Sequence, residues 1–402
     1  MTKKILLGLT LMLILIVPTT VLSAHAQSTN PGPTPPADGD SFKYNAAGST
    51  FIYPLMDKWR VEYGTLYSGI KLNYQSIGSG AGIKLYVAKK VDFGASDAPL
   101  QSSDYKKAPK GTLTIPESMG AIVMTYNLPG VQKNGLLLTG DVIAKIYLGQ
   151  IIYWHDDAIV SLQTDPSIAQ ALKDDRNKIV LVHRSDGSGT TYAFTDYLSK
   201  VSSDWASKVG YATSVPWPTG MGGPGNAGVA AIVKKVPESL GYVELGYATH
   251  NKMVSVTGNG AGTTGSGQHP MPFAYVQNAD GTAFVDPSVV TNVEAAASNA
   301  ISSLPDPSGV WSHVSIANQP GPNTYPIASF TYLLVNPNLE QVKGESQQKA
   351  NDLVSLFYYM IGDGQQYAQK LGYAPLPGNL QNLDYTGLAE IKYNGQQIWA
   401  YP

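Results

Sequence analysis

Hydrophobic and polar positions alternate with two different periods along most of the chain. Apolar and β-branched residues that alternate with polar ones, or that form short runs, predict strands at residues 44–47, 70–75, 91–95, 122–126, 179–182 and 328–335. Apolar residues spaced three or four positions apart predict helices at residues 54–63, 82–89, 192–201, 228–235, 286–304 and within 345–369. This alternation of strands and helices indicates an α/β fold with a largely parallel or mixed sheet.

Proline and aspartate residues mark the ends of two of these helices. Pro54 suits the first turn of helix 54–63. We expect Asp286 to cap helix 286–304, with Pro287 at its first helical position and Pro305 just after its end.

The start of the chain has the pattern of a signal peptide over residues 1–26. Lys3 and Lys4 precede an apolar run that ends at Val17, and the sequence Ala-His-Ala at 24–26 matches a cleavage site. The run is shorter than the roughly 20 residues that span a bilayer. We therefore expect an exported protein, with a short uncleaved anchor as the alternative.

Two further segments read as loops. Residues 27–41 are rich in proline, glycine and small polar side chains, which predicts a flexible-to-extended spacer. The folded body is expected to begin near Phe42. Residues 257–268 contain only glycine and small or polar side chains and predict a second loop without core-forming residues.

Composition excludes several kinds of site. The 402 residues include no cysteine, which excludes disulfides, thiolate metal sites, cysteine nucleophiles and a lipid-modified cysteine. A chain of this length can bury a core without them, and it suggests two domains or more. Because only 14% of residues are charged and the formal net charge is −2, the chain lacks the electrostatic signature of a nucleic-acid-binding protein. An anion would have to be held by a local arrangement of donors.

Two glycine-rich turns each join a predicted strand to a predicted helix, at residues 48–51 (GSTF) and 76–82 (SIGSGAG). Backbone N–H groups at a helix N-terminus are unsatisfied and lie at the positive end of the helix dipole, so they favour an anion. Thr50 and Ser79 could add hydroxyl donors. The second turn has neither the Walker nor the dinucleotide spacing. An ordinary helix cap and a plain turn are the alternatives.

A third turn, at residues 183–191 (HRSDGSGTT), carries a charge. Arg184 can hold a tetrahedral oxyanion through two parallel hydrogen bonds, and Asp186 could fix the guanidinium. Ser188, Gly189 and Thr190 would present hydroxyls and N–H groups at the start of the next helix. A turn without a ligand is the alternative.

Asp97 follows the predicted strand at 91–95. An ionised carboxylate only accepts hydrogen bonds, so beside an anion it requires a ligand that carries a proton, such as hydrogen phosphate. Sulfate has no proton at neutral pH and would leave the carboxylate unpaired, which costs at least about 1–3 kcal/mol. A turn or cap role is the alternative.

Seven segments share one family resemblance. They are AAGSTF (46–51), YQSIGSGAGIK (74–84), VDFGASDAP (91–99), IYLGQI (146–151), HRSDGSGTTYAFTDYL (183–198), GNAGVAAIVK (225–234) and LGYVELGYA (240–248). In this order, and over most of residues 43–250, they resemble the periplasmic phosphate-binding protein of the high-affinity phosphate ABC transporter.

The resemblance implies a type II periplasmic-binding-protein fold, in which two α/β lobes joined by two crossing strands close over the ligand. One lobe would comprise residues 42–122 and 329–402, and the other residues 123–328. It further implies high-affinity binding of inorganic phosphate outside the cytoplasmic membrane and delivery to the membrane permease of an ABC importer. Such a protein acts as a monomer, without cofactor, metal or catalysis. The implied phosphate ligands are Thr50, Phe51 (backbone N–H), Ser79, Asp97, Arg184, Ser188, Gly189 (backbone N–H) and Thr190, with Asp186 as the partner of the arginine.

Two departures from the family and three rival functions stay open. His183 stands where many relatives have another basic residue, and we expect it to be a hydrogen-bonded histidine near the site. The segment 269–325 looks longer than usual. A receptor for arsenate, sulfate or a phosphorylated metabolite is one rival, and a surface protein in adhesion or sensing is another. A phosphatase or esterase is the third, although Ser188 lacks the Gly-x-Ser-x-Gly elbow and no histidine is placed as its base.

Overall fold

The computed structural model describes residues 31–250 and 270–401. The predicted signal peptide (1–26), the first residues of the predicted spacer and the glycine-rich segment 257–268 lie outside these residues.

Strands and helices alternate through the first half of the chain, as the sequence pattern predicts. The strands are β1 (Phe42–Gly48), β2 (Ile70–Ser76), β3 (Phe93–Ser96), β4 (Leu113–Asn127), β5 (Leu137–Leu138), β6 (Val180–Arg184), β7 (Met221–Gly223), β8 (Ser239–Glu244), β9 (Tyr275–Gln277), β10 (Phe284–Val285), β11 (Ala328–Val335), β12 (Tyr373–Ala374), β13 (Lys392–Tyr393) and β14 (Gln396–Gln397). The α-helices are α1 (Tyr53–Leu66), α2 (Ser79–Val87), α3 (Ser102–Tyr105), α4 (Gly140–Tyr147), α5 (Asp157–Val160), α6 (Pro166–Asp174), α7 (Gly189–Val201), α8 (Ser203–Lys208), α9 (Gly225–Lys235), α10 (Leu245–Thr249), α11 (Val290–Ala300), α12 (Gln347–Ile361) and α13 (Gly378–Ala389). Short 3₁₀ helices are η1 (Ile301–Ser303), η2 (Leu339–Gln341), η3 (Asp363–Tyr367) and η4 (Gln369–Leu371).

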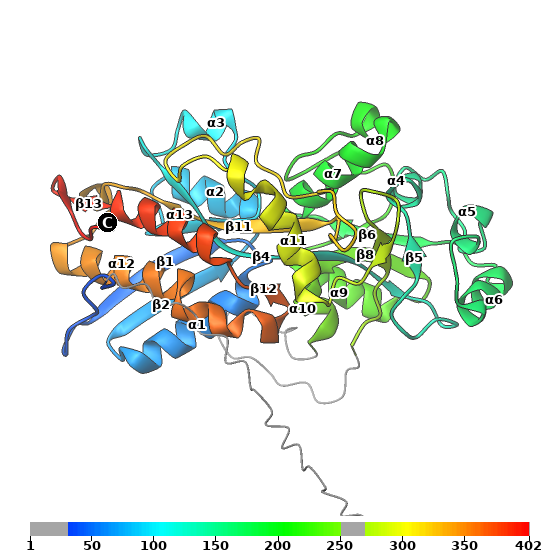
Figure 1. Ribbon diagram of the computed structural model, residues 1–402, viewed down its shortest axis with the longest axis horizontal. Helices are drawn as coiled ribbons and strands as arrows, with labels where there is room; N and C mark the ends of the chain where they lie inside the picture. Colours follow the sequence, from blue (N-terminus) through cyan, green and yellow to red (C-terminus); the bar gives the residue numbers. More distant parts are fainter. Residues whose placement is uncertain (1–30, 251–269, 402) are drawn as a thin grey trace, which may run out of the picture. The chain divides into compact units, whose positions relative to one another are not determined.

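A mixed nine-stranded sheet organises the described residues. Its order is β2-β1-β3-β11-β4-β8-β6-β7, and β12 pairs with β4 beside this path. β1 is parallel to β2 and β3, and β11 is antiparallel to both β3 and β4. On the other side of β4, β8 is antiparallel to β4 and parallel to β6. Figure 1 shows β1 and β2 with their helices on one side of β4, and β6 and β8 on the other.

The long strand β4 belongs to both sides of the sheet. Its residues 113–121 pair with β11, and its residues 122–127 pair with β8. All of its residues except Asn127 are buried, as expected for a strand covered on both faces. The predicted strand 122–126 is only its second half, because Pro116 and Gly120 hide the strand pattern of the first half. The predicted lobe boundary after residue 122 falls within β4, and the division into two lobes stays a prediction.

Opposed strand directions bring several turns to the middle of β4. β3 runs parallel to β4 and ends at Ser96, whereas β8 runs against β4 and ends with Glu244 opposite Ile122. β1 and β2 share the direction of β3, and β6 shares the direction of β8. The turns that follow β1, β2 and β3 therefore face the turn that follows β6.

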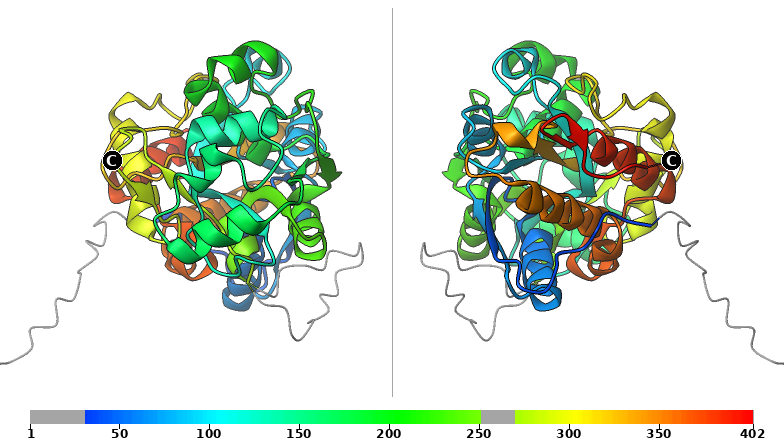
Figure 2. Two further views of the ribbon diagram at one scale, coloured as in Figure 1. Left: turned by 90° about the vertical axis from the view of Figure 1, so that its right-hand side faces the viewer. Right: turned by 90° about the vertical axis from the view of Figure 1, so that its left-hand side faces the viewer.

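The C-terminal helices return to the side of the sheet where the chain begins. α12 contacts α1, and Figure 2 shows α12 (orange) beside α1 (blue). Trp59 on α1 is fully buried, and its Nε1 donates to the backbone oxygen of Gly364 at 2.8 Å. Burial of an aromatic side chain of this size stabilises the fold by about 3 kcal/mol, so this contact holds the two ends of the body together.

Helix α11 differs from its prediction. It begins at Val290 and not near Asp286, and it ends at Ala300, followed by η1. The Asp286 carboxylate accepts hydrogen bonds from the N–H and the hydroxyl of Ser288 at 2.8 and 2.7 Å. Asp286 therefore stabilises a separate turn before the helix, as aspartate commonly does.

The last part of the predicted spacer packs on the body. Pro33 and Pro36 are buried, and Gly32 lies against the ring of Tyr358. Gln348 donates to the Asp40 carboxylate at 3.0 Å. The body therefore begins before Phe42, because these prolines contribute apolar surface that the composition of the segment conceals. Within the described residues, no helix has both the length and the apolar character needed to cross a membrane.

Candidate anion-binding site

The three predicted turns come together in the structure. Each leads into a helix: Ile52 precedes α1, Gly78 precedes α2 and Ser188 precedes α7 as the N-cap residue. The N–H of Gly80 donates to the backbone oxygen of Gly187 at 2.9 Å, which joins the second turn to the third. The structure thus places three helix N-termini around one region, where their dipoles favour an anion.

One side of this region, the arginine wall, consists of residues 184–190. The Arg184 side chain is 1% exposed, and its Nε and Nη2 donate to the Asp186 carboxylate at 2.8 and 2.5 Å. Its Nη1 donates to the Thr190 hydroxyl at 3.2 Å. Burial raises the pKa of Asp186, but the hydrogen bonds and the charge of Arg184 outweigh it, so the pKa lies below its usual value. The ionised aspartate holds the guanidinium in one orientation.

The opposite side, the aspartate wall, consists of residues 49–51, Ser79 and Asp97. The Asp97 carboxylate is 3% exposed and accepts hydrogen bonds from the hydroxyls of Ser49 and Ser79, the latter at 3.3 Å. Burial raises the pKa of Asp97 to about 6, against the opposing effect of these hydroxyls and of Arg184. At neutral pH the carboxylate is therefore mostly ionised and can only accept hydrogen bonds.

The two walls are in direct contact. A Cβ atom on Gly189 would lie 2.5 Å from the Ser79 hydroxyl and 2.6 Å from an Asp97 carboxylate oxygen. Only glycine fits at this distance, since other residues would force the walls apart. The predicted ligand Gly189 is thus the point where the arginine wall touches the aspartate wall.

Asn226, which the sequence reasoning missed, also links the walls. It is fully buried at the start of α9, and its Nδ2 donates to the hydroxyls of Thr50 at 3.0 Å and Thr190 at 3.2 Å. Its backbone N–H donates to the same Thr50 hydroxyl at 3.2 Å. Its position after the short strand β7, in another strand-to-helix turn, is the signal that could have identified it.

The remaining predicted ligands also lie in the site, with hydrogen bonds inside the protein. The N–H of Phe51 donates to the Ser49 hydroxyl at 2.9 Å, and the Ser188 hydroxyl accepts from the N–H of Thr191 at 3.0 Å. The backbone oxygens of Thr50 and Phe51 accept hydrogen bonds from two buried tyrosines, Tyr247 at 2.6 Å and Tyr373 at 2.5 Å. Ser49 is a second residue to which the sequence reasoning assigned no role.

His183 behaves as predicted. Its Nδ1 lies 2.9 Å from the backbone oxygen of Arg184, and its ring stacks on Trp217 with centroids 4.8 Å apart. Both contacts support the strand end that carries Arg184, so the histidine has a structural role beside the site.

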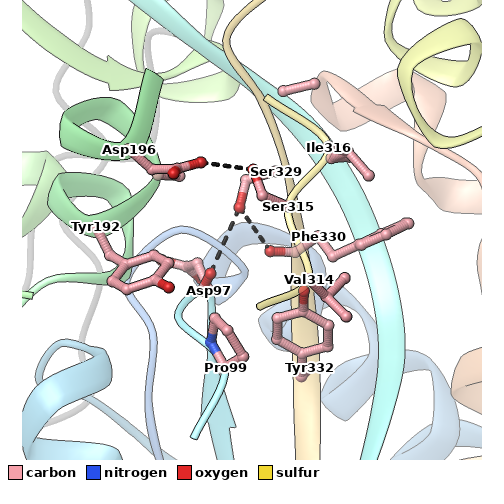
Figure 3. A pocket seen from close by; sticks show the side chains of 12 residues that line it. Asp97, Pro99, Tyr192, Asp196, Val314, Ser315, Ile316, Ser329, Phe330 and Tyr332 are labelled. Carbon is pink, nitrogen blue, oxygen red and sulfur yellow. Dashed lines mark hydrogen bonds between the residues drawn. The ribbon is translucent and has the colours of Figure 1, made fainter. Parts of the chain in front are cut away.

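Asp97 is also packed against β11. Figure 3 shows Asp97 beside a small cavity that is bordered by Tyr192 and Asp196 of α7, by Ser315, and by Ser329 of β11. The Ser329 hydroxyl lies 3.5 Å from the backbone oxygen of Asp97. The Ser315 hydroxyl donates to Asp196 at 2.5 Å. The backbone of Asp97 therefore lies beside a region where α7, β11 and the segment that carries Ser315 come together.

Together the walls suit a tetrahedral oxyanion that carries a proton. The arginine wall offers a fixed guanidinium and the N-terminus of α7, which stabilise negative charge. The aspartate wall adds hydroxyls and one buried acceptor, which requires a donor on the ligand.

Comparison with known proteins identifies the family to which this chain belongs. Residues 33–362 match the model of the PBP superfamily domain. The phosphate-binding protein PstS of Xylella fastidiosa (strain Temecula1) is 41% identical over 367 residues, which cover 90% of this chain and 88% of that protein. The phosphate-binding protein PstS of Methanocaldococcus jannaschii is 35% identical over 401 residues, with 97% and 96% covered.

Solved structures show the same fold at lower identity. The structure of a high-affinity periplasmic phosphate-binding protein bound with phosphate matches with a TM-score of 0.60 and 20% identity, over 85% of this chain and 92% of that one. The ancestral soluble variant of the human phosphate-binding protein matches with a TM-score of 0.62 and 18% identity, over 85% and 92%. The fold is therefore that of the periplasmic binding proteins, and the chain belongs to the PstS-type family of phosphate-binding proteins.

Proposed function

We propose that this chain binds inorganic phosphate with high affinity outside the cytoplasmic membrane and delivers it to the membrane permease of an ABC importer. One observation carries the proposal: the buried Arg184 guanidinium, oriented by Asp186, and the buried Asp97 carboxylate lie in two walls that meet at Gly189. Its relatives named PstS, at 35–41% identity, support the same function.

The proposed ligands divide between the two walls. Arg184 would donate two hydrogen bonds to phosphate oxygens, while the hydroxyls of Ser188 and Thr190 and the N–H of Gly189 would donate further ones. From the aspartate wall, Thr50, Ser79 and the N–H of Phe51 would donate as well. Each bond to a charged group contributes roughly 1.5–3 kcal/mol. A few of them together reach the about 8 kcal/mol of micromolar binding.

Asp97 is the proposed source of selectivity. As an acceptor it would take the P–OH hydrogen of hydrogen phosphate, which sulfate lacks at neutral pH. A buried carboxylate next to an unprotonated anion would stay unpaired, and its desolvation would go uncompensated.

We further infer that the protein works as two lobes that close over phosphate. The lobes would be residues 42–122 with 329–402, and residues 123–328, joined through β4 and β11. The hydrogen bonds between Gly80 and Gly187 and between Thr50 and Asn226 would then hold the closed form. The protein would act as an exported monomer without a cofactor.

We propose binding without catalysis. The Ser188 hydroxyl accepts the N–H of Thr191 and so serves as the cap of α7. We infer that Ser188 has a structural and ligand-binding role and is not a nucleophile that a base activates.

Titration calorimetry with phosphate and with sulfate tests the proposal. The mature protein should first be denatured and refolded, so that carried-over ligand is removed. We expect micromolar or tighter binding of phosphate and, from the cost of an unpaired carboxylate, at least about fivefold weaker binding of sulfate. Equal affinity for both anions would contradict the role of Asp97. Release of many phosphate molecules per protein from a phosphomonoester would show an enzyme.

A further inference from the structure

Glu117 is a fully buried carboxyl group near Asp97 that the proposed phosphate site does not use. In the pairing of β4 with β11, Ser118 lies opposite Thr331 and Pro116 lies opposite Tyr332. Glu117 is therefore the extra residue of a β-bulge. Bulges re-aim a side chain and are frequent beside functional sites.

The bulge places the Glu117 side chain against Thr331. The Thr331 hydroxyl lies 3.1 Å from Oε1 of Glu117. Tyr332 of β11 pairs with Ser96 of antiparallel β3, so Thr331 and Asp97 are the next residues at this end of the two strands, and the Thr331 hydroxyl lowers the pKa of Asp97. Oε2 of Glu117 has no hydrogen-bond partner among the described residues. The Nε2 of Gln365 donates to the backbone oxygen of Glu117 at 2.9 Å, which fixes the bulge.

A buried carboxyl group with one unpaired oxygen is most stable as the neutral acid. Burial accordingly raises the pKa of Glu117 to about 8, the negative charge of Asp97 acts in the same direction, and the Thr331 hydroxyl opposes both. Other ionisable groups around this pair are Tyr74 on β2, Arg184 on β6, Glu244 at the end of β8, Tyr247 on α10 and Tyr373 on β12.

We propose that Glu117 is a positioning residue for anion binding, a role that rests on the proposed function. As a neutral acid it donates its hydrogen to Thr331, so that the Thr331 hydroxyl hydrogen stays available to Asp97. When Glu117 loses its proton, it takes up the Thr331 hydrogen and adds a negative charge behind the bound anion.

This arrangement couples proton binding to phosphate binding. A bound anion increases the proton affinity of Glu117, and by reciprocity the protonated form binds phosphate more tightly. Because the pKa of Glu117 is about 8, the group is neutral at pH 7 and becomes ionised as the pH rises above 8. Phosphate affinity should therefore fall at alkaline pH because Glu117, a group of the protein, becomes ionised.

The pH profile of the phosphate Kd tests this coupling in the full-length mature protein. The comparison is between the wild type and Glu117→Gln, in which the amide keeps a donor and the shape but cannot ionise. Glu238→Gln is the matched control, because burial also raises the pKa of Glu238, to about 7, while that side chain faces Asn177 and Asp175 and none of the proposed ligands.

We expect the Kd values of the three proteins to agree within about twofold at pH 7. At pH 9 the wild type and Glu238→Gln should bind phosphate about fivefold or more weakly than Glu117→Gln, the range typical of coupled sites. Parallel pH profiles for the wild type and Glu117→Gln would overturn the proposal. If the wild type does not bind phosphate at pH 7, the proposed function itself is refuted.

A spectroscopic measurement covers the case in which Glu117→Gln does not fold. Infrared difference spectra of the wild type at pH 8.5, with and without phosphate, report the carbonyl stretch of protonated carboxylic acids. We expect phosphate to increase this band, and we expect Thr331→Val to shift its frequency because a hydrogen bond is lost. No increase, or no shift in Thr331→Val, would contradict the proposal.

Discussion

The arginine wall and the aspartate wall of the proposed site carry opposite kinds of group. On the arginine wall, the charged group is the Arg184 guanidinium, which can only donate hydrogen bonds and which Asp186 holds at 2.5 Å. On the aspartate wall, the charged group is the Asp97 carboxylate, which can only accept hydrogen bonds when it is ionised. Burial raises the pKa of Asp97 to about 6. In the proposed site, the arginine wall would therefore attract any oxyanion, and the aspartate wall would accept only a ligand that brings a proton.

The difference shows how a nearly neutral chain can recognise an anion. In the proposed site, attraction would come from the buried Arg184 guanidinium and from helix N-termini, so it would need no large positive surface. Selectivity would come from Asp97, a negative group in the same site, which would disfavour the wrong ligand more than it stabilises the right one.

Arg184→Ala should have the largest effect on affinity. It removes the guanidinium assigned to the anion, and with it two proposed hydrogen bonds to phosphate that contribute roughly 1.5–3 kcal/mol each. Phosphate Kd, measured by calorimetry, should rise by about 100-fold or more. Arg60→Ala is the control, because Arg60 forms a similar pair with Asp57 at 2.5 Å, but with side chains 44% and 39% exposed. Similar small effects of both variants would show that the arginine wall does not supply the attraction.

Gly189→Ala should weaken phosphate binding by separating the walls. The new methyl group would meet the Ser79 hydroxyl at 2.5 Å and the Asp97 carboxylate at 2.6 Å. Overpacking costs about 1–3 kcal/mol, which corresponds to roughly fivefold to 150-fold in Kd.

Gly378→Ala, at the start of α13, is the control. A Cβ atom at Gly378 would meet no atom within 4 Å, so we expect a change of no more than about threefold. If both alanine variants bind phosphate like the wild type, contact between the walls is not required for binding.

Asp97→Asn should change selectivity more than affinity. The amide can donate a hydrogen bond, so it removes the penalty for an unprotonated anion. The ratio of sulfate Kd to phosphate Kd should fall by about tenfold, the equivalent of about 1.4 kcal/mol. Ser49→Ala removes the hydroxyl that most lowers the pKa of Asp97, so it should raise that pKa and lower the ratio at neutral pH, in the same direction as Asp97→Asn. An unchanged ratio in Asp97→Asn would assign selectivity to another group.

Asn226→Ala should have the smallest effect of these variants. It should shorten the lifetime of the complex with phosphate. It deletes the side-chain bonds to Thr50 and Thr190, each of which contributes about 0.5–1.5 kcal/mol. We expect phosphate to dissociate about three- to tenfold faster in stopped-flow measurements, with little change in association. Asn73→Ala removes an exposed amide that donates to Asn45 at 3.1 Å, and it should match the wild type.

Much of the site could be read from local sequence, because each turn carries its own chemistry. Three glycine- and hydroxyl-rich turns and one arginine were visible as isolated segments, and the structure brings all of them together. The sequence analysis assigned no role to Ser49 and Asn226. A serine beside a predicted ligand, or an asparagine in the first turn of a helix, can have many structural roles. The boundary error at α11 had a similar cause, since Asp286 caps its own turn and not the helix.

The sequence by itself determined which donors stand at the starts of helices, because strand-to-helix turns are set by residues that are neighbours in the chain. Only the tertiary structure decided that the turns after β1, β2 and β3 face the turn after β6. That meeting depends on strands of opposite direction that share β4, a non-local pairing that no short segment encodes. The proton affinities of Asp97 and Glu117 were decided in the same way, because burial by distant segments sets them.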